Sequence, residues 1–467
     1  MPEKASGPRA LLVQPPVYDF ALYDLFLHPY GLLRIGAWLE QSGYEVELLD
    51  SLDARRPGRA DGAGRGRIGR SVVETPAVLR DVPRRYARYG LAPDTLRERI
   101  RNSAADVVLL GTGMTYWYEG LAEIAEMLRE EMPSAPVIAG GIAATLTPQT
   151  VAEAASTDYV VRGDGDASGG ASGGASGGAS GGTSGPALPK LLASLGLPPL
   201  RGPLPANPGL SLQLRSARLR DAAVIRLHEG CRGACSYCAS RLITPRFRAG
   251  TEQDARERIR EATAAGITTF AFYDDALLED SATLLEPLLE WVVSVHGERR
   301  LAFYLPNAVH VERLTSDVAR LLYLAGCREV RLGVESLDEG FHARYDRKLR
   351  GAVIAQTVRI LTDAGFRGRE IAAYVLAGLP GQTADEVRST VGGLGKLGCA
   401  PYVAEYSPVP GTPLFEAACE VSRYPLRSEP LCHNNSIFPT ASRSFTIDDL
   451  WKAKAEARAV RLELSTR

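Results

Sequence analysis

The sequence has no run of about 18 apolar residues, so it predicts no membrane-spanning helix. Its formal net charge is −1, and this balance gives no broad electrostatic drive for binding nucleic acid. No secretory segment opens the chain, so we expect a cytoplasmic protein with reduced thiols. No G-x-G-x-x-G motif follows the first predicted strand, which argues against a nicotinamide or flavin site. The 467 residues, 45% of them hydrophobic, suffice for two domains of ordinary size and a tail.

Three of the seven cysteines are clustered, and their spacing is the most informative feature of the chain. Cys231, Cys235 and Cys238 form a C-x3-C-x2-C motif. Thiolates are soft ligands that suit iron–sulfur clusters, and three of them leave one iron of a [4Fe–4S] cluster open. An open iron can chelate the amino and carboxylate groups of S-adenosylmethionine (SAM), and an electron from the cluster can then release a 5′-deoxyadenosyl radical. Tyr237, directly before the last cysteine, can pack beside the adenine.

Another interpretation of the motif stays open. His228 lies three residues before Cys231, so this histidine and the three cysteines also fit a Cys3His zinc site. The remaining cysteines are scattered, without the spacing for a second cluster: Cys327, Cys399, Cys419 and Cys432. We interpret Cys327 and Cys399 as structural, and Cys432 as either an ordinary tail cysteine or a substrate-facing one.

The cysteine motif lies within a regular alternation of strands and helices. Six strands are predicted, at 222–227, 268–273, 301–306, 329–335, 371–377 and 401–406. Five helices connect them, at 251–265, 282–295, 315–325, 352–364 and 384–397, and glycine follows each helix, as C-termini prefer. This order predicts a partial (β/α)6 barrel of the TIM type, with its chemistry at the carboxyl ends of the strands. The cysteines follow the first strand, where such a site belongs.

Further polar and glycine-rich residues follow the other strands. They are Asp274 and Asp275, Glu335 and Ser336, Gly378 and Pro380, and Pro408. Each acidic residue is also a possible helix N-cap, and each glycine a turn residue. As a set on one rim, they are better explained by a ligand.

The first part of the chain predicts a second α/β domain. Strands at 9–14, 45–50, 106–114, 136–141 and 158–161 alternate with helices such as 30–43 and 118–131. We expect a Rossmann-like, doubly wound parallel sheet of about five strands, which binds ligands beyond their carboxyl ends.

Taken together, these motifs resemble the radical SAM superfamily, in a subgroup with an N-terminal cobalamin-binding domain and no assigned substrate. The segments that carry the resemblance are LHPYG, GMTYWY, the cysteine motif, FYDD, RLGVES, GLPGQT and SPVPGTP. The resemblance implies that Asp274 and Asp275 contact the SAM amino group, and that Glu335 and Ser336 contact its ribose or carboxylate. The loops of Gly378, Pro380 and Pro408 would face the adenine.

For the N-terminal domain, the resemblance implies a cobalamin nucleotide tail surrounded by two segments and by the loop 28–31. The residues of the two segments are Thr112, Met114, Thr115, Gly140 and Gly141. The cobalt-ligating motif of this fold is D-x-H-x-x-G. Here His28 is present but its aspartate is displaced to Asp24, so His28 is either a cobalt ligand or an ordinary loop histidine.

The predicted domains are a cobalamin-binding, Rossmann-like domain at 1–165, a Gly/Ser-rich linker and connector at 166–221, the radical SAM core at 222–413, and a substrate-side extension at 414–467. Residues 52–93 form an insert, interpreted as a loop that caps the cobalamin or substrate cavity; its arginines, glycines and tyrosines also permit a nucleic-acid interpretation. Tyr116, Trp117 and Tyr118 either line that cavity or pack in the core. The ASGG repeats of the linker predict a mobile junction between domains.

The function expected from the resemblance is cobalamin-dependent methyl transfer to an unactivated carbon or phosphorus centre. The substrate would be a small molecule or peptide, and the reductant of the flavodoxin or ferredoxin type. One alternative is a radical rearrangement or cyclisation without methyl transfer. Another is a zinc-stabilised protein that binds cobalamin or nucleic acid without catalysis. No catalytic side chain is assigned from the sequence.

Overall fold

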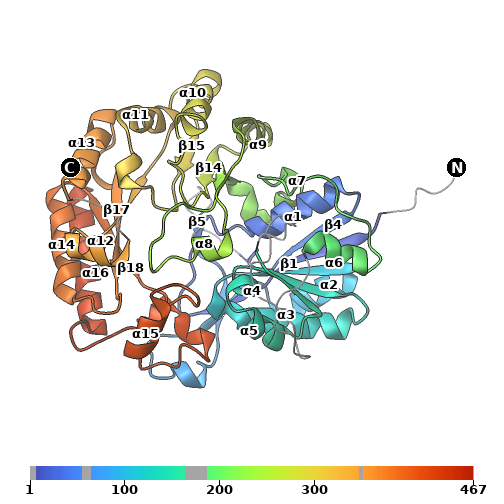
Figure 1. The fold of residues 1–467 in the computed structure, drawn as a ribbon. Coiled ribbons are helices and arrows are strands. Elements are labelled where there is room, and N and C mark those ends of the chain that lie inside the picture. Colours follow the sequence, from blue (N-terminus) through green and yellow to red (C-terminus); the bar gives the residue numbers. More distant parts are fainter. Residues whose placement is uncertain (1–6, 55–64, 164–186, 347–350, 466–467) are drawn as a thin grey trace. The chain divides into compact units, whose positions relative to one another are not determined.

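The structure, a computed structural model, describes residues 7–54, 65–163, 187–346 and 351–465. The predicted ASGG run at 167–186 and part of the insert, 55–64, lie outside the described residues. The chain divides into an N-terminal unit, residues 1–221 with 242–245, and a C-terminal unit, residues 222–241 with 246–467. Figure 1 shows the elements of both units.

The N-terminal unit is built on a five-stranded parallel sheet. In spatial order its strands are β10 (Tyr159–Val161), β9 (Val137–Gly141), β8 (Val107–Thr112), β1 (Arg9–Gln14) and β4 (Glu45–Asp50). The chain starts at β1, pairs it with β4 on one side and continues through β8 on the other. The prediction of a doubly wound sheet is confirmed.

Alternate residues of the strands bury against two layers of helices. Leu11 and Val13 face one layer, and Ala10 and Leu12 face the other. The first layer contains α2 (Pro93–Asn102), α3 (Tyr118–Glu131), α4 (Ile142–Leu146) and α5 (Pro148–Ala155). The second contains α1 (Tyr30–Gln41), α6 (Leu188–Ser194), α7 (Leu210–Gln213) and the 3-10 helix η3 (Ala217–Asp221). Both faces of the sheet are therefore covered.

The predicted connector is a folded part of this unit. Leucines of α6, α7 and η3 fill the same core as Leu12. The segment before α7 is also bonded to the unit, because Tyr44 Oη donates to the carbonyl of Pro198 (2.6 Å) and Tyr30 Oη to that of Ala206 (2.7 Å). Residues 187–221 thus do not form a free junction between domains, because their apolar side chains complete one face of the sheet.

A buried cluster of opposite charges fixes the end of the connector. The Arg218 side chain is fully buried, with Nη2 2.9 Å from Asp50 Oδ2 and Nη1 3.3 Å from Asp24 Oδ2. Ser216 Oγ also donates to Asp50 Oδ2 (2.9 Å). Arg218 therefore joins η3 to the end of β4 and to the start of the loop that carries His28.

The described part of the insert is folded as well. Its strands β7 (Ala87–Tyr89) and β6 (Arg70–Val72) form a three-stranded antiparallel sheet with β2 (Val17–Asp19), in the order β2, β7, β6, and β5 (Arg65–Gly66) pairs with β3 (Asp24–Leu25). Both β2 and β3 belong to the segment after β1, outside the insert. The insert also contains the 3-10 helix η1 (Ala77–Leu79). Arg88 makes two hydrogen bonds to Glu123 of α3 (2.7 and 2.8 Å), and Tyr18 Oη donates to the same carboxylate (2.9 Å). The insert is thus fixed on α3, and the prediction of a loop is wrong for the described residues.

The C-terminal unit contains the six predicted parallel strands. Three pair in the order β11 (Ala223–Ile225), β14 (Thr269–Phe272), β15 (Ala302–Tyr304), and three in the order β16 (Val330–Glu335), β17 (Ile371–Ala377), β18 (Ala400–Glu405). Between these two groups of three strands, the pairing is limited to isolated parallel bridges from Phe303 to Cys327 and from Val309 to Leu332. A short hairpin of β12 (His228–Glu229) and β13 (Arg248–Ala249) follows β11. This order is that of a partial barrel.

Six helices lie outside these strands (Figure 1): α9 (Glu252–Ala264), α10 (Leu285–His296), α11 (Ser316–Ala325), α13 (Gly351–Ala364), α14 (Ala384–Lys396) and α16 (Ile447–Leu464). The last of them, α16, packs on β18 and α14, so it is the sixth barrel helix although the sequence analysis assigned it to the extension. The shorter helices are α8 (Ser240–Ile243), α12 (Glu339–Tyr345), α15 (Phe415–Val421) and the 3-10 helices η2 (Thr115–Trp117), η4 (Val311–Arg313), η5 (Gly368–Glu370), η6 (Pro430–His433) and η7 (Asn435–Ile437). Among the described residues, no helix has the length and apolarity to span a membrane.

Candidate functional site

The three clustered cysteines lie on the loop that follows β11 and β12. Gly233 N donates to Cys231 Sγ (3.2 Å). A Cβ atom at Gly233 would lie 3.2 Å from Cys231 Sγ and 3.9 Å from Cys235 Sγ, so two of the sulfur atoms converge on this glycine. Cys235 is buried, Cys231 is half-buried and Cys238 is exposed. The loop thus presents thiols at the carboxyl end of the first barrel strand.

His228 is packed away from the cysteines. Its side chain is fully buried, its Nδ1 lies 3.2 Å from Asp274 Oδ1, and its ring stacks on Phe247. Within the described residues, no three His, Cys, Asp or Glu side chains are gathered closely enough to hold one metal ion. A zinc ion needs its four ligands at about 2.0–2.3 Å, whereas each cysteine of a cluster binds a different iron atom. The donor set therefore fits a cluster better than a Cys3His zinc ion.

Two aspartates follow β14, and they have different hydrogen-bond and ion-pair partners. Asp274 is buried, and its Oδ1 accepts hydrogen bonds from the backbone N–H of Leu227 (2.9 Å) and of His228 (2.6 Å). It therefore anchors the entrance of the cysteine loop, which is a structural task beside its predicted SAM contact. Asp275 lies 3.5 Å from Arg226 and accepts from Ser240 (3.4 Å). Burial raises the pKa of Asp275, and the charge of Arg226 opposes that shift.

The end of β16 combines a strained residue with a turn. Glu335 has φ +62° at a bulge in the pairing of β16 with β17, and such strain in a non-glycine residue gathers at functional sites. Ser336 is 1% exposed, and its Oγ accepts from Asp338 N (3.0 Å). Its side chain thus stabilises a turn, and the SAM contact of Ser336 stays a prediction.

The loops after β17 and β18 are held by the segment that follows them. Gly378 N donates to Gln382 Oε1 (2.7 Å), and the Gly378 carbonyl accepts from Thr440 Oγ1. Pro380 presents its carbonyl to Tyr345 Oη (2.7 Å). Beside the buried Pro408, Ser407 Oγ donates to the carbonyl of His433 (2.6 Å). Residues 430–440 therefore cover the predicted adenine-facing loops.

Changing Gly378 to alanine should destabilise the C-terminal unit. Its φ is +94°, and a Cβ atom there would lie 2.4 Å from the ring of Phe438. The left-handed backbone costs about 1–2 kcal/mol and overpacking about 1–3 kcal/mol, so we expect the free energy of unfolding to fall by about 2–5 kcal/mol in chemical denaturation. The matched control is Gly392→Ala in α14, where a Cβ atom meets no neighbour within 4 Å and should stabilise by about 0.5–1 kcal/mol. Equal effects at the two glycines would contradict the contact with Phe438.

The covering segment itself is buried. Cys432 is fully buried, and burial raises the pKa of its thiol to about 12, so the structure favours a structural cysteine over a substrate-facing one. His433 is 1% exposed, and burial lowers its pKa to about 4, although its Nε2 bonds to the carbonyl of Leu426 (2.8 Å).

This histidine should make the C-terminal unit sensitive to acid. The unfolded chain binds a proton at His433 near pH 6.5, and the folded one only near pH 4. Its contribution to stability is therefore present above about pH 6.5 and is lost as the pH falls towards 4. Between pH 7 and pH 5 we expect it to cost about 2 kcal/mol in urea denaturation. His433→Gln should remove that part of the pH dependence, and an unchanged dependence in the variant would contradict this origin.

In the N-terminal unit, the ends of β8 and β9 form a narrow cradle. Thr112 Oγ1 donates to the carbonyl of Gly140 (2.9 Å) and accepts from Ala144 N (3.0 Å). Gly141 has φ +112°, and a Cβ atom there would lie 2.6 Å from the carbonyl oxygen of Thr112. Only glycine permits this close approach between the ends of β8 and β9.

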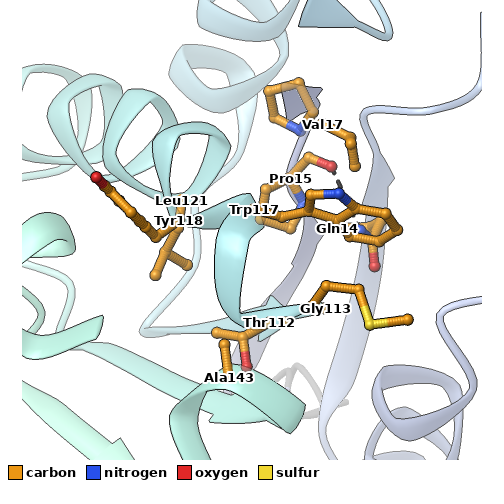
Figure 2. Close-up of a pocket in the computed structure, with 12 residues that line it drawn as sticks. Gln14, Pro15, Val17, Thr112, Gly113, Trp117, Tyr118, Leu121 and Ala143 are labelled. Carbon is orange, nitrogen blue, oxygen red and sulfur yellow. Dashed lines mark hydrogen bonds between the residues drawn. The ribbon is translucent and has the colours of Figure 1, made fainter. Parts of the chain in front are cut away.

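The cradle adjoins a small cavity (Figure 2), lined by Gln14, Pro15, Pro16, Val17, Gly111, Thr112, Gly113, Met114, Trp117, Tyr118, Leu121 and Ala143. Its volume of about 10 Å³ holds about one water molecule, so a larger ligand would lie over its mouth. Met114 is 44% exposed there, whereas Thr115 is buried. Trp117 lines this small cavity, packs beside the insert and donates from Nε1 to Asp19 (2.9 Å); its role in a cobalamin or substrate cavity stays a prediction.

His28 is 8% exposed, in the loop before α1. Asp24 is the aspartate that is displaced relative to the cobalt-ligating motif. It accepts from Leu27 N (2.8 Å) and binds Arg218. The roles of His28 as a cobalt ligand and of the cradle residues as cobalamin contacts stay predictions.

One unit of the chain is a partial barrel with three cysteines after its first strand, and the other is a doubly wound sheet. These features define a two-domain iron–sulfur protein. Residues 225–392 match the family model of the radical SAM superfamily, and residues 81–170 match that of the B12 binding domain. The chain thus contains a radical SAM domain and a cobalamin-binding domain. Its cofactors are a [4Fe–4S] cluster, SAM and cobalamin, as the sequence predicted.

Similar proteins agree with this assignment. The threonylcarbamoyladenosine tRNA methylthiotransferase MtaB of Thermotoga maritima is 24% identical over 203 residues, which are 42% of this chain and 45% of that protein. The chain thus matches less than half the length of this curated relative. The radical SAM methyltransferase TsrM from Kitasatospora setae has a TM-score of 0.64 at 18% identity, over 97% of this chain and 89% of that one. The cobalamin-dependent SAM radical enzyme OxsB has a TM-score of 0.57 at 12% identity, over 98% and 61%. The two solved structures show the shared fold.

Sequence reasoning missed two histidines near the cysteine loop. His310 Nε2 lies 4.0 Å from Cys231 Sγ. His342 and Asp346 form a pair of α12, which is hydrogen-bonded to Tyr237. The four-residue spacing of His342 and Asp346 on a helix was the available signal for the pair. Their hydrogen-bonding partner, Tyr237, lies more than 100 residues earlier in the chain.

Proposed function

We propose that this protein is a cobalamin-dependent radical SAM methyltransferase, which acts on an unactivated carbon or phosphorus centre of a small-molecule or peptide substrate. The observation that carries the proposal is the presence, in one chain, of the three-cysteine loop at the strand ends of the barrel and of a B12 binding domain. TsrM is named a methyltransferase and MtaB a methylthiotransferase, which supports methyl transfer as the reaction class. A reductant of the flavodoxin or ferredoxin type and a cytoplasmic location belong to the same proposal.

When bound, the cluster and SAM supply a radical and cobalamin supplies the methyl group; the chain holds these groups and excludes water. Cys231, Cys235 and Cys238 would hold the cluster, and the loops of Gly378 and Pro408 would enclose the adenine. The buried thiols do not compete for iron, because burial raises the pKa of Cys327 and Cys399 to about 12.

The test is a labelling experiment that needs no knowledge of the substrate. Protein reconstituted anaerobically with iron, sulfide and cobalamin is reduced and supplied with SAM whose methyl group is deuterated. We expect the label in the bound corrinoid, together with slow formation of 5′-deoxyadenosine, by mass spectrometry. Protein that binds no corrinoid would refute the proposal. Formation of 5′-deoxyadenosine without label in the corrinoid would favour the alternative, a rearrangement or cyclisation.

A further inference from the structure

The C-terminal turn of α12 lies against three of the strand-end loops in the C-terminal unit. The backbone N–H of Ser236, in the cysteine loop, donates to the carbonyl of Tyr345 (2.8 Å). Tyr345 Oη donates to the carbonyl of Pro380, in the loop after β17 (2.7 Å). The end of β16 precedes α12 directly. This one turn is therefore placed to hold the loops in a fixed arrangement.

A chain of three hydrogen bonds starts from the aromatic residue between the cluster cysteines. Tyr237 Oη donates to Asp346 Oδ2 (3.0 Å), Asp346 Oδ1 lies 2.8 Å from His342 Nδ1, and His342 Nε2 donates to the carbonyl of Ser336 (2.8 Å). The Asp346 side chain is fully buried and that of His342 is 5% exposed. The chain is thus shielded from water, where a hydrogen bond to a charged group is strong.

The charge state of the His342–Asp346 pair strengthens this chain of hydrogen bonds. Burial alone would lower the pKa of His342, but its bonds to Asp346 and to the Ser336 carbonyl outweigh burial and raise it. Both ring nitrogens face acceptors, so the protonated ring satisfies both contacts.

We propose that Asp346 and His342 are positioning residues, which hold Tyr237 and thereby the turn between Cys235 and Cys238 in the shape that the cluster needs to bind SAM. Cys238 N donates to the Cys235 carbonyl (3.2 Å), and the Ser236 carbonyl accepts from Leu414 N (3.0 Å). Tyr237 adds a side-chain anchor at the centre of the turn. The inference rests on the radical SAM assignment and is independent of methyl transfer.

The test compares Tyr237→Phe, Asp346→Asn and His342→Gln with the control His296→Gln. His296 lies at the end of α10 against Trp291, away from the loop. In the reconstituted and reduced proteins, SAM is titrated while the EPR spectrum of the cluster is recorded. We expect each of the three variants to need about tenfold more SAM than the control for the spectral shift, a size typical for partners that orient metal ligands. In metal-free protein, alkylation of Cys235 should be faster in the three variants.

The double variant Tyr237→Phe/Asp346→Asn tests the chain as a unit. If the bond between the two side chains carries the effect, the double variant should need no more SAM than either single variant. The proposal is overturned if Tyr237→Phe, which keeps the ring and its packing, behaves like the control in both assays. That variant decides the matter even if Asp346→Asn does not fold. Loss of label transfer to corrinoid, by contrast, would affect only the proposed function.

Discussion

Protein in which Cys231, Cys235 and Cys238 are all replaced by alanine is expected to lose its complement of about four irons and four sulfides. Formation of 5′-deoxyadenosine should fall to that of a blank without protein. The physical reason is that the other thiols of the described chain cannot replace the three ligands: Cys327, Cys399 and Cys432 are fully buried, and Cys419 alone supplies only one ligand. Iron and sulfide analysis after anaerobic reconstitution measures the first effect, and liquid chromatography the second.

The matched control for this variant is Cys419→Ala, a half-buried cysteine of α15 outside the motif. It should reconstitute and cleave SAM like the unchanged protein. Corrinoid binding should persist in both variants, because the cradle of Thr112 and Gly141 belongs to the N-terminal unit. Four irons in the triple variant, or zinc without sulfide in the unchanged protein, would contradict the cluster.

Replacing Arg218 by alanine is expected to lower the free energy of unfolding of the N-terminal unit by about 3–5 kcal/mol. The variant leaves the carboxylates of Asp24 and Asp50 buried without their shared guanidinium, and both side chains are 1% exposed. Chemical denaturation monitored by tryptophan fluorescence measures the change. Because η3 then loses its anchor, the loop between β3 and α1 should also become more accessible to proteolysis.

Arg220 provides the comparison for this variant. It lies in the same 3-10 helix, is exposed, and donates to the carbonyl of Leu214. Arg220→Ala should change stability by no more than about 0.5 kcal/mol, as expected for a surface position. A similar loss in the two variants would mean that η3 depends on its own helical shape rather than on the buried charges.

Most of the strands, the helix ends and the cysteine motif could be predicted from local sequence patterns. The strands of both sheets are short apolar runs, and the glycines after the barrel helices do adopt positive φ, as at Gly326 and Gly398. The cysteine motif was identifiable because its three ligands lie within eight residues. Asp274 and Ser336 were placed correctly at strand ends, but their buried bonds to the backbone depend on distant segments and leave no trace in local sequence.

What the sequence did not predict depends on contacts between distant segments. The leucines of α6 and α7 follow a Gly/Ser run, so composition favoured a linker, yet they pack on a sheet face whose residues lie 27 (Val161 to Leu188) to 202 (Ala10 to Leu212) positions earlier in the chain. Helix α16 has no marked apolar side, and its assignment to the barrel comes only from its packing on β18 and α14. The insert was interpreted as a loop because its strands are three residues or shorter, and they gain stability from α3 through Glu123.

Because residues 187–221 pack on the same sheet as β10, the ASGG run begins and ends within one folding unit. It therefore closes a loop in the chain topology, and its length sets no distance between the two cofactor domains.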